Sequence, residues 1–279
     1  MTPEQKYLTC KEFTSLCGIT KNTLVWYEKK GLISPKMVGE NGYHYYGKEQ
    51  FYEIDLIKSL KWVDKSLDEC KSYMEHRSED TYLPMLLEQQ RVLGEKITAL
   101  SGQKSIVDQT IQDYLSMKSR YSEEPKIVAM PERYFLSEPI ENNTSRGYMK
   151  SLNRLFETFH NCLPIYKVAP SMLNAAIICQ SDLLTENYQK LSYVCLKIAS
   201  QIPIKMCLTI PKGEFALCFH KGKVEEISGT YATLTAFIQS KGLEVAGDAI
   251  ESDFLNYLVT DNPELYAKEI LIPVRPKEK

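Results

Sequence analysis

The sequence predicts an α+β protein built from three successive parts: a small helical module, one long helix, and a domain of helices and antiparallel strands. Short capped helices fill the first part, helical periodicity fills the second, and strand-like segments follow Pro125. The predicted boundaries are residues 1–78, 79–121 and 122–279. A chain of 279 residues suits two separate hydrophobic cores.

The first predicted helix begins after Thr9 and ends at Gly18. Thr9, followed three residues later by Glu12, forms a capping-box pattern, in which each side chain can bond the other residue's backbone N–H. Phe13 and Leu16 are predicted to supply the buried face of this helix.

A second helix is predicted directly after the first, with Thr20 as its N-cap. Leu24, Trp26 and Tyr27 are its candidate anchors, and one of the two aromatic rings is expected to pack inward. Gly31 ends the helix, because glycine readily adopts left-handed backbone. Two helices joined by so short a turn are typical of a helix-turn-helix motif.

A β-hairpin is predicted next, in the segment "VGENGYHYY" at Val38–Tyr46. Asn41-Gly42 between extended segments is the strongest short hairpin signal, so a wing is expected beside the two helices. Two amphipathic helices are predicted behind it, at Lys48–Val63 and Leu67–Met74, the first with Phe51, Ile54, Ile57, Leu60 and Val63 on one side.

One long helix is predicted from about Asp80 to Tyr121. Its apolar residues recur in the pattern of a two-stranded coiled coil, although Gln90 and Lys104 occupy seam positions. A single helix cannot bury such a stripe, so a homodimer is predicted, by either parallel or antiparallel pairing. The predicted inward residues are Leu86, Leu93, Ile97, Leu100, Val107, Ile111 and Tyr114.

The last part of the chain is rich in strand-like segments. Strand, helix, strand, strand occurs twice, which indicates a duplicated α+β domain with an antiparallel sheet. The helices are expected at Ser145–His160 and Gly229–Lys241. The strands are expected at Ile127–Ser137, Leu173–Gln180, Tyr193–Ile198, Glu214–His220, Ala249–Thr260 and Leu265–Val274.

The composition limits the classes of function that the protein can have. A net charge of −2 argues against a general nucleic-acid binder, but positive charge is concentrated locally, with five lysines against two glutamates in residues 18–48. No apolar run could span a bilayer and the start lacks a signal-peptide core, so a cytoplasmic protein without a membrane partner is expected. Reduced core thiols are expected for the eight cysteines, which form no C-x-x-C pair: Cys10, Cys17, Cys70, Cys162, Cys179, Cys195, Cys207 and Cys218.

A helix that enters the major groove of DNA carries small polar and basic side chains on its exposed face. The start of the second helix has this character, and lysines and tyrosines nearby could contact phosphates. The alternative for the lysines is an ordinary solvated face. The predicted DNA-binding residues are Thr20, Lys21, Asn22, Thr23, Tyr27, Lys30, Lys36, Tyr43, His44, Tyr45 and Lys48.

The segments "GLISP", "NGYHYY" and "DLIKSLK" resemble the winged-helix domain of the MerR family. The whole chain is similar to the BmrR-like multidrug-responsive members, whose effector domain is GyrI-like. The resemblance implies that the long helices pair antiparallel and that the dimer sits on double-stranded promoter DNA with an overlong spacer. It also implies that ligand binding distorts this DNA so that RNA polymerase can engage it. Three positions depart from the usual arginine of the family: Asn22, Val25 and His44.

Alternation along the predicted strand in Gly247–Tyr257 places Glu251, Asp253, Leu255 and Tyr257 on one face, which could simply be exposed. The resemblance instead places Glu251 where related proteins keep a buried glutamate for hydrophobic cationic ligands. It also matches Tyr148 and Tyr266 to aromatic pocket positions, and more loosely Phe215 and Met172, for which an ordinary core position is the alternative.

Two other functions fit parts of the sequence. Some GyrI-like domains are thought to hydrolyse small molecules with a glutamate and a tyrosine, for which Glu251 and Tyr266 are the candidates here. A metal sensor would carry cysteines after the long helix, and residues 115–130 contain none. The expectation is therefore a regulator rather than an enzyme, without catalytic residues, a metal or a cofactor.

Overall fold

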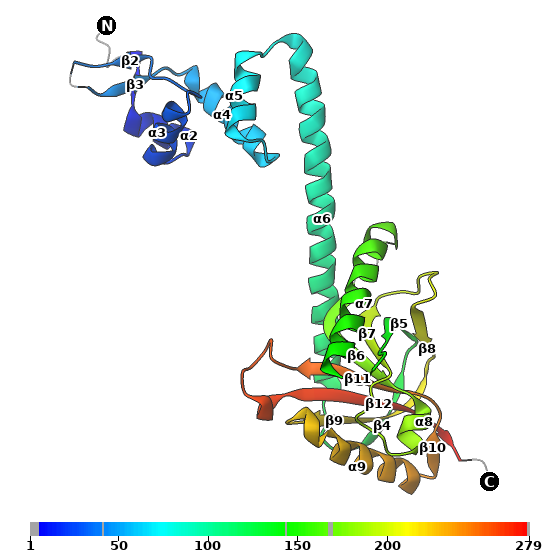
Figure 1. Ribbon diagram of the computed structural model, residues 1–279. Helices are drawn as coiled ribbons and strands as arrows, with labels where there is room; N and C mark the ends of the chain where they lie inside the picture. Colours follow the sequence, from blue (N-terminus) through cyan, green and yellow to red (C-terminus); the bar gives the residue numbers. More distant parts are fainter. Residues whose placement is uncertain (1–5, 41, 143, 167–169, 278–279) are drawn as a thin grey trace. The chain divides into compact units, whose positions relative to one another are not determined.

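The computed structural model describes residues 6–40, 42–142, 144–166 and 170–277, and the side chains of residues 162–164 also lie outside the description. The chain divides into two compact units, Met1–Ala99 and Leu100–Lys279, which are considered separately (Figure 1). The α+β class and the order of its parts are as predicted. Asn41, on which the hairpin prediction rested, lies outside the described residues.

The first unit contains the predicted helix-turn-helix. Thr9 and Glu12 form the capping box, and Gly18 ends the first helix with φ +62°. Thr20 caps the second helix, and Gly31 follows it with φ +68°. A three-stranded sheet has the order β1-β3-β2. The elements are β1 (Leu8–Thr9), α2 (Cys10–Cys17), α3 (Lys21–Lys29), β2 (Met37–Val38), β3 (His44–Tyr46), α4 (Gln50–Trp62) and α5 (Leu67–Glu75).

The core of this unit joins the helices to β3, where the ring of Tyr46 stacks on that of Phe13 at 4.7 Å. Of the two aromatic neighbours on α3, Tyr27 is buried and Trp26 is exposed. The prediction that Leu16 is buried was wrong, since its side chain is 57% exposed. Cys17, one helical turn after Phe13, takes the inward position.

Helix α6 runs from Glu79 to Arg120, with Pro84 in its first turns. Tyr114 packs against the core of the second unit, but the other six residues predicted to face a partner are exposed in the single chain. Their exposed fractions run from 37% at Leu93 to 64% at Ile97 and Leu100. The stripe therefore has no covering within the described chain, and dimerisation through it remains a prediction.

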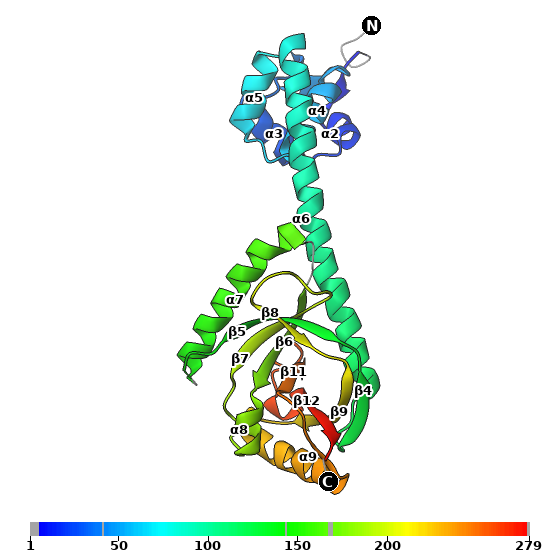
Figure 2. The same cartoon turned by 90° about the vertical axis from the view of Figure 1, so that its right-hand side faces the viewer.

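The second unit is a curled antiparallel sheet with helices beside it (Figure 2). Its strands follow the order β4-β9-β12-β11-β6-β7-β5-β8, and β10 pairs with β12. The strands are β4 (Lys126–Met130), β5 (Arg133–Pro139), β6 (Pro170–Ile178), β7 (Tyr193–Ile198), β8 (Cys207–Ile210), β9 (Gly213–Lys221), β10 (Leu243–Val245), β11 (Ala249–Leu255) and β12 (Ala267–Pro276). The α-helices are α7 (Ser145–Tyr166), α8 (Gln180–Leu184) and α9 (Ile227–Ser240).

The predicted duplication is visible in the strand order. One half, β5-α7-β6-β7, arranges its strands as β5-β7-β6, and the other, β9-α9-β11-β12, arranges them as β9-β12-β11. The halves meet where β6 and β11 pair antiparallel. Helices α7 and α9 pack on one face of the sheet, and the end of α6 packs on the other.

Several strand boundaries differ from the prediction. The segment Ile127–Ser137 is two strands, because Pro131-Glu132 separates β4 from β5. The strand expected to reach Thr260 ends at Leu255, after a change of register following Asp253. Strands β8 and β10 and helix α8 were not predicted, since they are too short to show a clear periodicity.

Candidate ligand-binding and DNA-binding sites

A cavity of about 370 Å³ lies on the helix-covered face of the sheet, where the two halves of the second unit meet. Its size suits a small organic molecule. Strands β6, β11 and β12, helix α7 and the segment before α9 contribute to its wall. The lining includes Tyr148, Ala176, Tyr188, Glu251, Asp253 and Lys268.

Glu251 is the most buried acidic group of this cavity, with only 3% of the residue exposed. The hydroxyl of Tyr231 on α9 donates a hydrogen bond to its Oε1 at 3.0 Å. Lys268 Nζ lies 3.9 Å from Glu251 Oε2 but 2.6 Å from Asp253 Oδ1. The lysine is thus bonded directly to the aspartate and only loosely to the glutamate.

Burial sets the protonation behaviour of this group of side chains. Loss of water raises the pKa of Glu251 above its usual 4.5, although Lys268 and the hydrogen bond from Tyr231 oppose the change. Desolvation alone would lower the pKa of Lys268, but Asp253 and Glu251 outweigh it and raise that pKa. Burial also raises the pKa of Tyr148 and of Tyr231, so both phenols stay neutral.

The described residues that line the cavity carry an excess of negative charge. Glu225, Glu251 and Asp253 face one cationic side chain, Lys268. Aromatic rings complete the wall: Tyr148 lies on α7, and the Tyr188 ring stacks on that of Tyr231 at 5.0 Å. Acidic groups beside aromatic rings are the features that a bound organic cation requires.

The structure brings Glu251 and Tyr148 to one cavity, but it does not place the other predicted pocket residues there. Tyr266 is half-buried after a short 3-10 helix and is not part of the lining. Phe215 lies in the core on the opposite face, since strand pairing puts it on the other side of the sheet from Glu251. Met172 is 53% exposed near α6, where its N–H donates to Thr110.

The residues of this site that were missed from the sequence include Tyr188, Tyr231 and Lys268. Alternation on β12 would have shown that Lys268 and Ile270 share a face, but the pairing of Lys268 with Asp253 depends on the register of two strands. Tyr231 depends on where α9 packs on the sheet. Neither the pairing of Lys268 with Asp253 nor the position of Tyr231 can be read from a local sequence pattern.

The predicted DNA-binding face of the first unit is largely exposed. Thr20, Lys21 and Asn22 are exposed at the start of α3, and Thr23 is half-buried. The Thr20 hydroxyl accepts a hydrogen bond from the N–H of Thr23 at 3.0 Å, which fixes the first turn of the helix. The other exposed residues of the predicted set are Lys30, Lys36, Tyr43 and Lys48.

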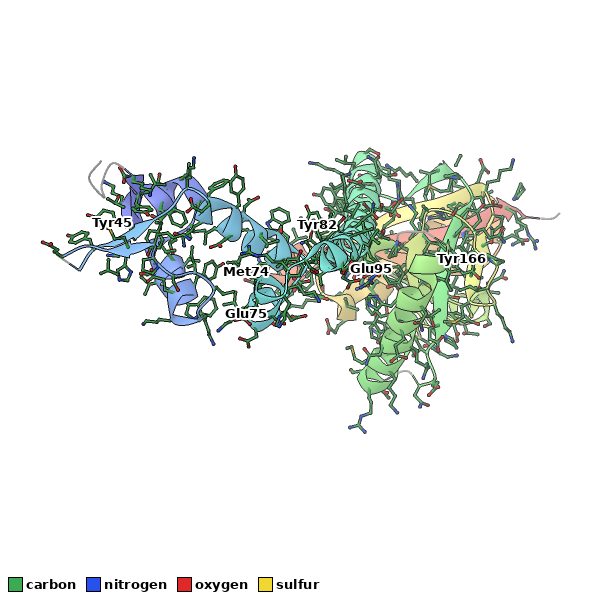
Figure 3. The ribbon with its side chains drawn as sticks, turned by 90° about the horizontal axis from the view of Figure 1, so that it is seen from above. Tyr45, Met74, Glu75, Tyr82, Glu95 and Tyr166 are labelled. Atoms are coloured by element: carbon green, nitrogen blue, oxygen red, sulfur yellow. The ribbon has the colours of Figure 1, made fainter. Side chains whose placement is uncertain are left out.

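Two residues of the predicted DNA-binding set are buried. Tyr27 and Tyr45 are 7% and 6% exposed and pack inside the unit, Tyr45 on β3 of the hairpin (Figure 3). Tyr27 was also a candidate anchor of the second helix, while Tyr45 was expected to contact a phosphate from the hairpin. Tyr27 packs in the core between the helices and β3, whereas Tyr45, which alternates with Tyr46 along β3, is buried on the other face of the three-stranded sheet.

Glu28 connects the second helix to the wing. Its Oε1 accepts a hydrogen bond from the Tyr46 hydroxyl and lies 3.0 Å from Nδ1 of His44. His44, where a family arginine would be expected, is therefore bound to a carboxylate of its own unit. Because Glu28 lies on α3 and both partners lie on β3, the helix and the hairpin are held as one surface.

Within the described parts of the chain, no three side chains of His, Cys, Asp or Glu are arranged to hold a metal ion. The seven cysteines whose side chains are described are all free thiols. A search of the described helices found none with the length and apolarity needed to cross a membrane.

A winged helix-turn-helix in one unit and an acidic, aromatic-walled cavity in the other define a class of protein: a DNA-binding module joined to a small-molecule-binding domain. A model of the GyrI-like small molecule binding domain matches residues 123–275, and a model of the MerR HTH family regulatory protein matches residues 8–77. The chain belongs to the GyrI-like family, with a DNA-binding module of the MerR family in front of that domain.

Two of the relatives that the chain matches are named as regulators. The chain is 26% identical over 280 residues to the multidrug-efflux transporter 2 regulator of Bacillus subtilis (strain 168). The aligned region covers 97% of each chain. It is 29% identical over 136 residues to the multidrug-efflux transporter 1 regulator of the same strain. That aligned region covers 48% of this chain and 46% of the relative.

Solved structures give more distant matches. An EcmrR–DNA complex, determined by cryo-electron microscopy, has a TM-score of 0.45 at 16% identity and covers 97% of this chain and 100% of that chain. A hydrolase from Listeria innocua has a TM-score of 0.41 at 15% identity and covers 59% of this chain and 98% of that one.

Proposed function

We propose that this protein is a ligand-responsive transcription regulator. As a dimer it binds promoter DNA through the first unit, and a hydrophobic organic cation binds beside Glu251 in the second. The bound ligand changes the conformation of the promoter DNA so that RNA polymerase can use it. The observation that carries the proposal is the buried Glu251 carboxylate in an aromatic-walled cavity whose acidic groups outnumber its cationic ones.

A cation is the expected ligand because of how the charges are paired. Lys268 is bonded to Asp253, which leaves Glu251 with one hydrogen bond from Tyr231 and a long ion pair of 3.9 Å to Lys268. A buried carboxylate that is incompletely paired is costly, so a positive ligand that reaches it gains that energy. Each aromatic face that the cation meets adds about 0.5–2 kcal/mol.

Recognition of DNA is assigned to the exposed start of α3, with the hairpin beside it. Thr20 and Asn22 present hydroxyl and amide groups to the major groove, and Lys21 and the lysines near the wing contact phosphates. The link through Glu28 supports simultaneous contact by helix and wing, since it holds the two together.

A direct test of this function is run-off transcription by bacterial RNA polymerase from a promoter duplex selected by the wild-type chain. Tetraphenylphosphonium should change the yield of transcript. Tetraphenylborate has the same shape and the opposite charge, and it should have no effect. Equal yields with the cation, with the anion and with neither would contradict the proposal.

Lys21→Ala is expected to weaken binding of the selected duplex and to lower the slope of log affinity against log salt by about 1, because one phosphate contact is lost. Affinity measured by fluorescence anisotropy at several salt concentrations checks this. Lys212→Ala, an exposed lysine between β8 and β9 of the other unit, is the matched control and should leave the slope unchanged. An unchanged slope for Lys21→Ala would remove Lys21 from the DNA-binding face.

Binding of tetraphenylphosphonium is expected to depend on pH. The cation requires the ionised form of Glu251, whose pKa lies above its usual 4.5 because the side chain is buried. Affinity should thus be complete above this raised pKa and fall as the pH decreases through it. Calorimetric titrations at a series of pH values measure the effect. A wild-type profile that stays flat over the range where Glu251 protonates would argue against its role.

Hydrolysis by Glu251 and Tyr266 is less well supported, because Tyr266 does not line the cavity. The tyrosine that touches Glu251 is Tyr231, and its hydroxyl proton is donated to the carboxylate. This arrangement favours a fixed acidic group for binding over a general base.

A further inference from the structure

A second cavity, of about 460 Å³, lies on the opposite face of the same sheet, beside the last turns of α6. Successive side chains of a strand point to opposite faces of the sheet. Ser252 and Glu269 therefore line the second cavity, whereas their neighbours Glu251 and Lys268 line the first. Its wall combines charged and apolar side chains, among them Asp113, Met117, Arg133, Phe135, Leu173 and Lys197.

Two buried charged side chains of this second cavity have hydrogen-bonding atoms without a partner. Arg133 is 7% exposed and Asp113 is 6% exposed. Across the described residues, the buried side-chain nitrogen and oxygen atoms that lack a hydrogen bond are Arg133 Nε and Nη2 and Asp113 Oδ2. Buried polar atoms are almost always paired, so three such atoms around one cavity indicate that something else satisfies them.

The neighbouring charged side chains already have hydrogen-bond partners. Glu269 accepts from Nε and Nη2 of Arg120, and the Oδ1 atom of Asp113 accepts from Lys197. The guanidinium of Arg133 lies over the ring of Phe215, with 5.0 Å between its Cζ and the ring centroid. Burial lowers the pKa of Arg133 to about 10, so the group is still charged at neutral pH.

The unpaired atoms specify the chemistry of a ligand. Nε–H and Nη2–H lie on one edge of the guanidinium, where they can meet the two oxygens of a carboxylate in a bidentate pair. Asp113 Oδ2 requires a hydrogen-bond donor. We propose that this cavity binds a small organic carboxylate that also carries a hydroxyl or amino group. The carboxylate pairs with Arg133, the donor meets Asp113, and the carbon skeleton packs against Met117, Phe135 and Leu173.

This site is independent of the proposed cation site, because the sheet lies between them. The second cavity selects an anionic ligand, whereas the first is proposed to bind a cation. A ligand in it contacts α6, since Asp113 and Met117 lie on that helix.

Calorimetric titration of the full chain tests the proposal with 4-hydroxybenzoate and its matched neutral amide, 4-hydroxybenzamide. The acid should bind saturably, and the amide about tenfold or more weakly, because it cannot form the charged bidentate pair. With 4-methylbenzoate, which lacks the donor for Asp113, binding should also be weaker. These comparisons use the wild-type chain alone, so they do not depend on whether a variant folds.

Variants then locate the binding. Arg133→Gln, and to a lesser extent Arg133→Lys, should lose affinity for 4-hydroxybenzoate, whereas Glu251→Gln should retain it. Absence of saturable binding to the wild type, equal binding of acid and amide, or unchanged affinity in Arg133→Gln would overturn the proposal. Loss of binding in Glu251→Gln would also overturn it, because the carboxylate would then depend on the first cavity.

Discussion

Glu251→Gln is expected to weaken the binding of tetraphenylphosphonium about 10- to 100-fold, because hydrogen bonds and contacts to a charged group contribute roughly 1.5–3 kcal/mol. The amide keeps the shape of the side chain and can still accept the hydrogen bond from Tyr231. The loss of affinity therefore measures the contribution of the negative charge of Glu251. Calorimetric titration of both proteins at pH 7.5 gives the two dissociation constants.

Two controls define the interpretation of that result. Glu225→Gln removes an exposed carboxylate from the same cavity and should change affinity little, since water screens it. Tetraphenylborate should not bind the wild type appreciably. If Glu251→Gln binds the phosphonium as tightly as the wild type does, the cation does not depend on this carboxylate.

Ile97→Asp should convert the protein from dimer to monomer at micromolar concentration. Ile97 is 64% exposed in the single chain and lies in the apolar stripe of α6. In a two-fold dimer the substitution removes two buried side chains, each contributing about 1.5–3 kcal/mol, and places two carboxylates at the contact. The dimer dissociation constant should therefore rise by roughly 100-fold or more. Sedimentation equilibrium measures it.

The matched control for dimerisation is Ala99→Asp, which adds the same charge on another side of the same helix. It should leave the protein dimeric. Ile97→Asp should also lose affinity for the selected duplex, since a monomer contacts only one half-site. A wild-type chain that sediments as a monomer, or a variant that stays dimeric, would show that this stripe is not the dimer contact.

Local signals made the first unit predictable. The capping box at Thr9 and the glycines at Gly18 and Gly31 each act within a few residues, so the sequence alone locates the ends of both helices. The error at Leu16 is also local, because a helix of eight residues has few turns from which to judge its buried side.

The candidate ligand site could be predicted only in part. Glu251 and Tyr148 were found through resemblance to a family, and the structure places both at one cavity. Phe215 was misplaced because alternation tells which residues share a face of one strand, but not which face of the sheet that is. Lys268 depends on the register between β11 and β12, which is a property of the folded sheet.

The second cavity had no signal in the sequence. Asp113 lies on α6 and Arg133 on β5, and neither occurs in a recognisable motif. Their unpaired atoms become apparent only when the neighbouring groups that could satisfy them are known to be bonded elsewhere.

The central claim is that a cation beside Glu251 alters DNA held by the other unit. It is tested most directly with 2-aminopurine placed at the centre of the selected promoter duplex, since its fluorescence rises when bases unstack. Tetraphenylphosphonium at a concentration that fills the wild-type cavity but leaves most of the variant's cavity empty should increase the fluorescence of the wild-type complex and change that of the Glu251→Gln complex much less at the same occupancy of DNA. An equal increase in both complexes, or no increase in the wild-type complex with its cavity filled, would contradict the claim.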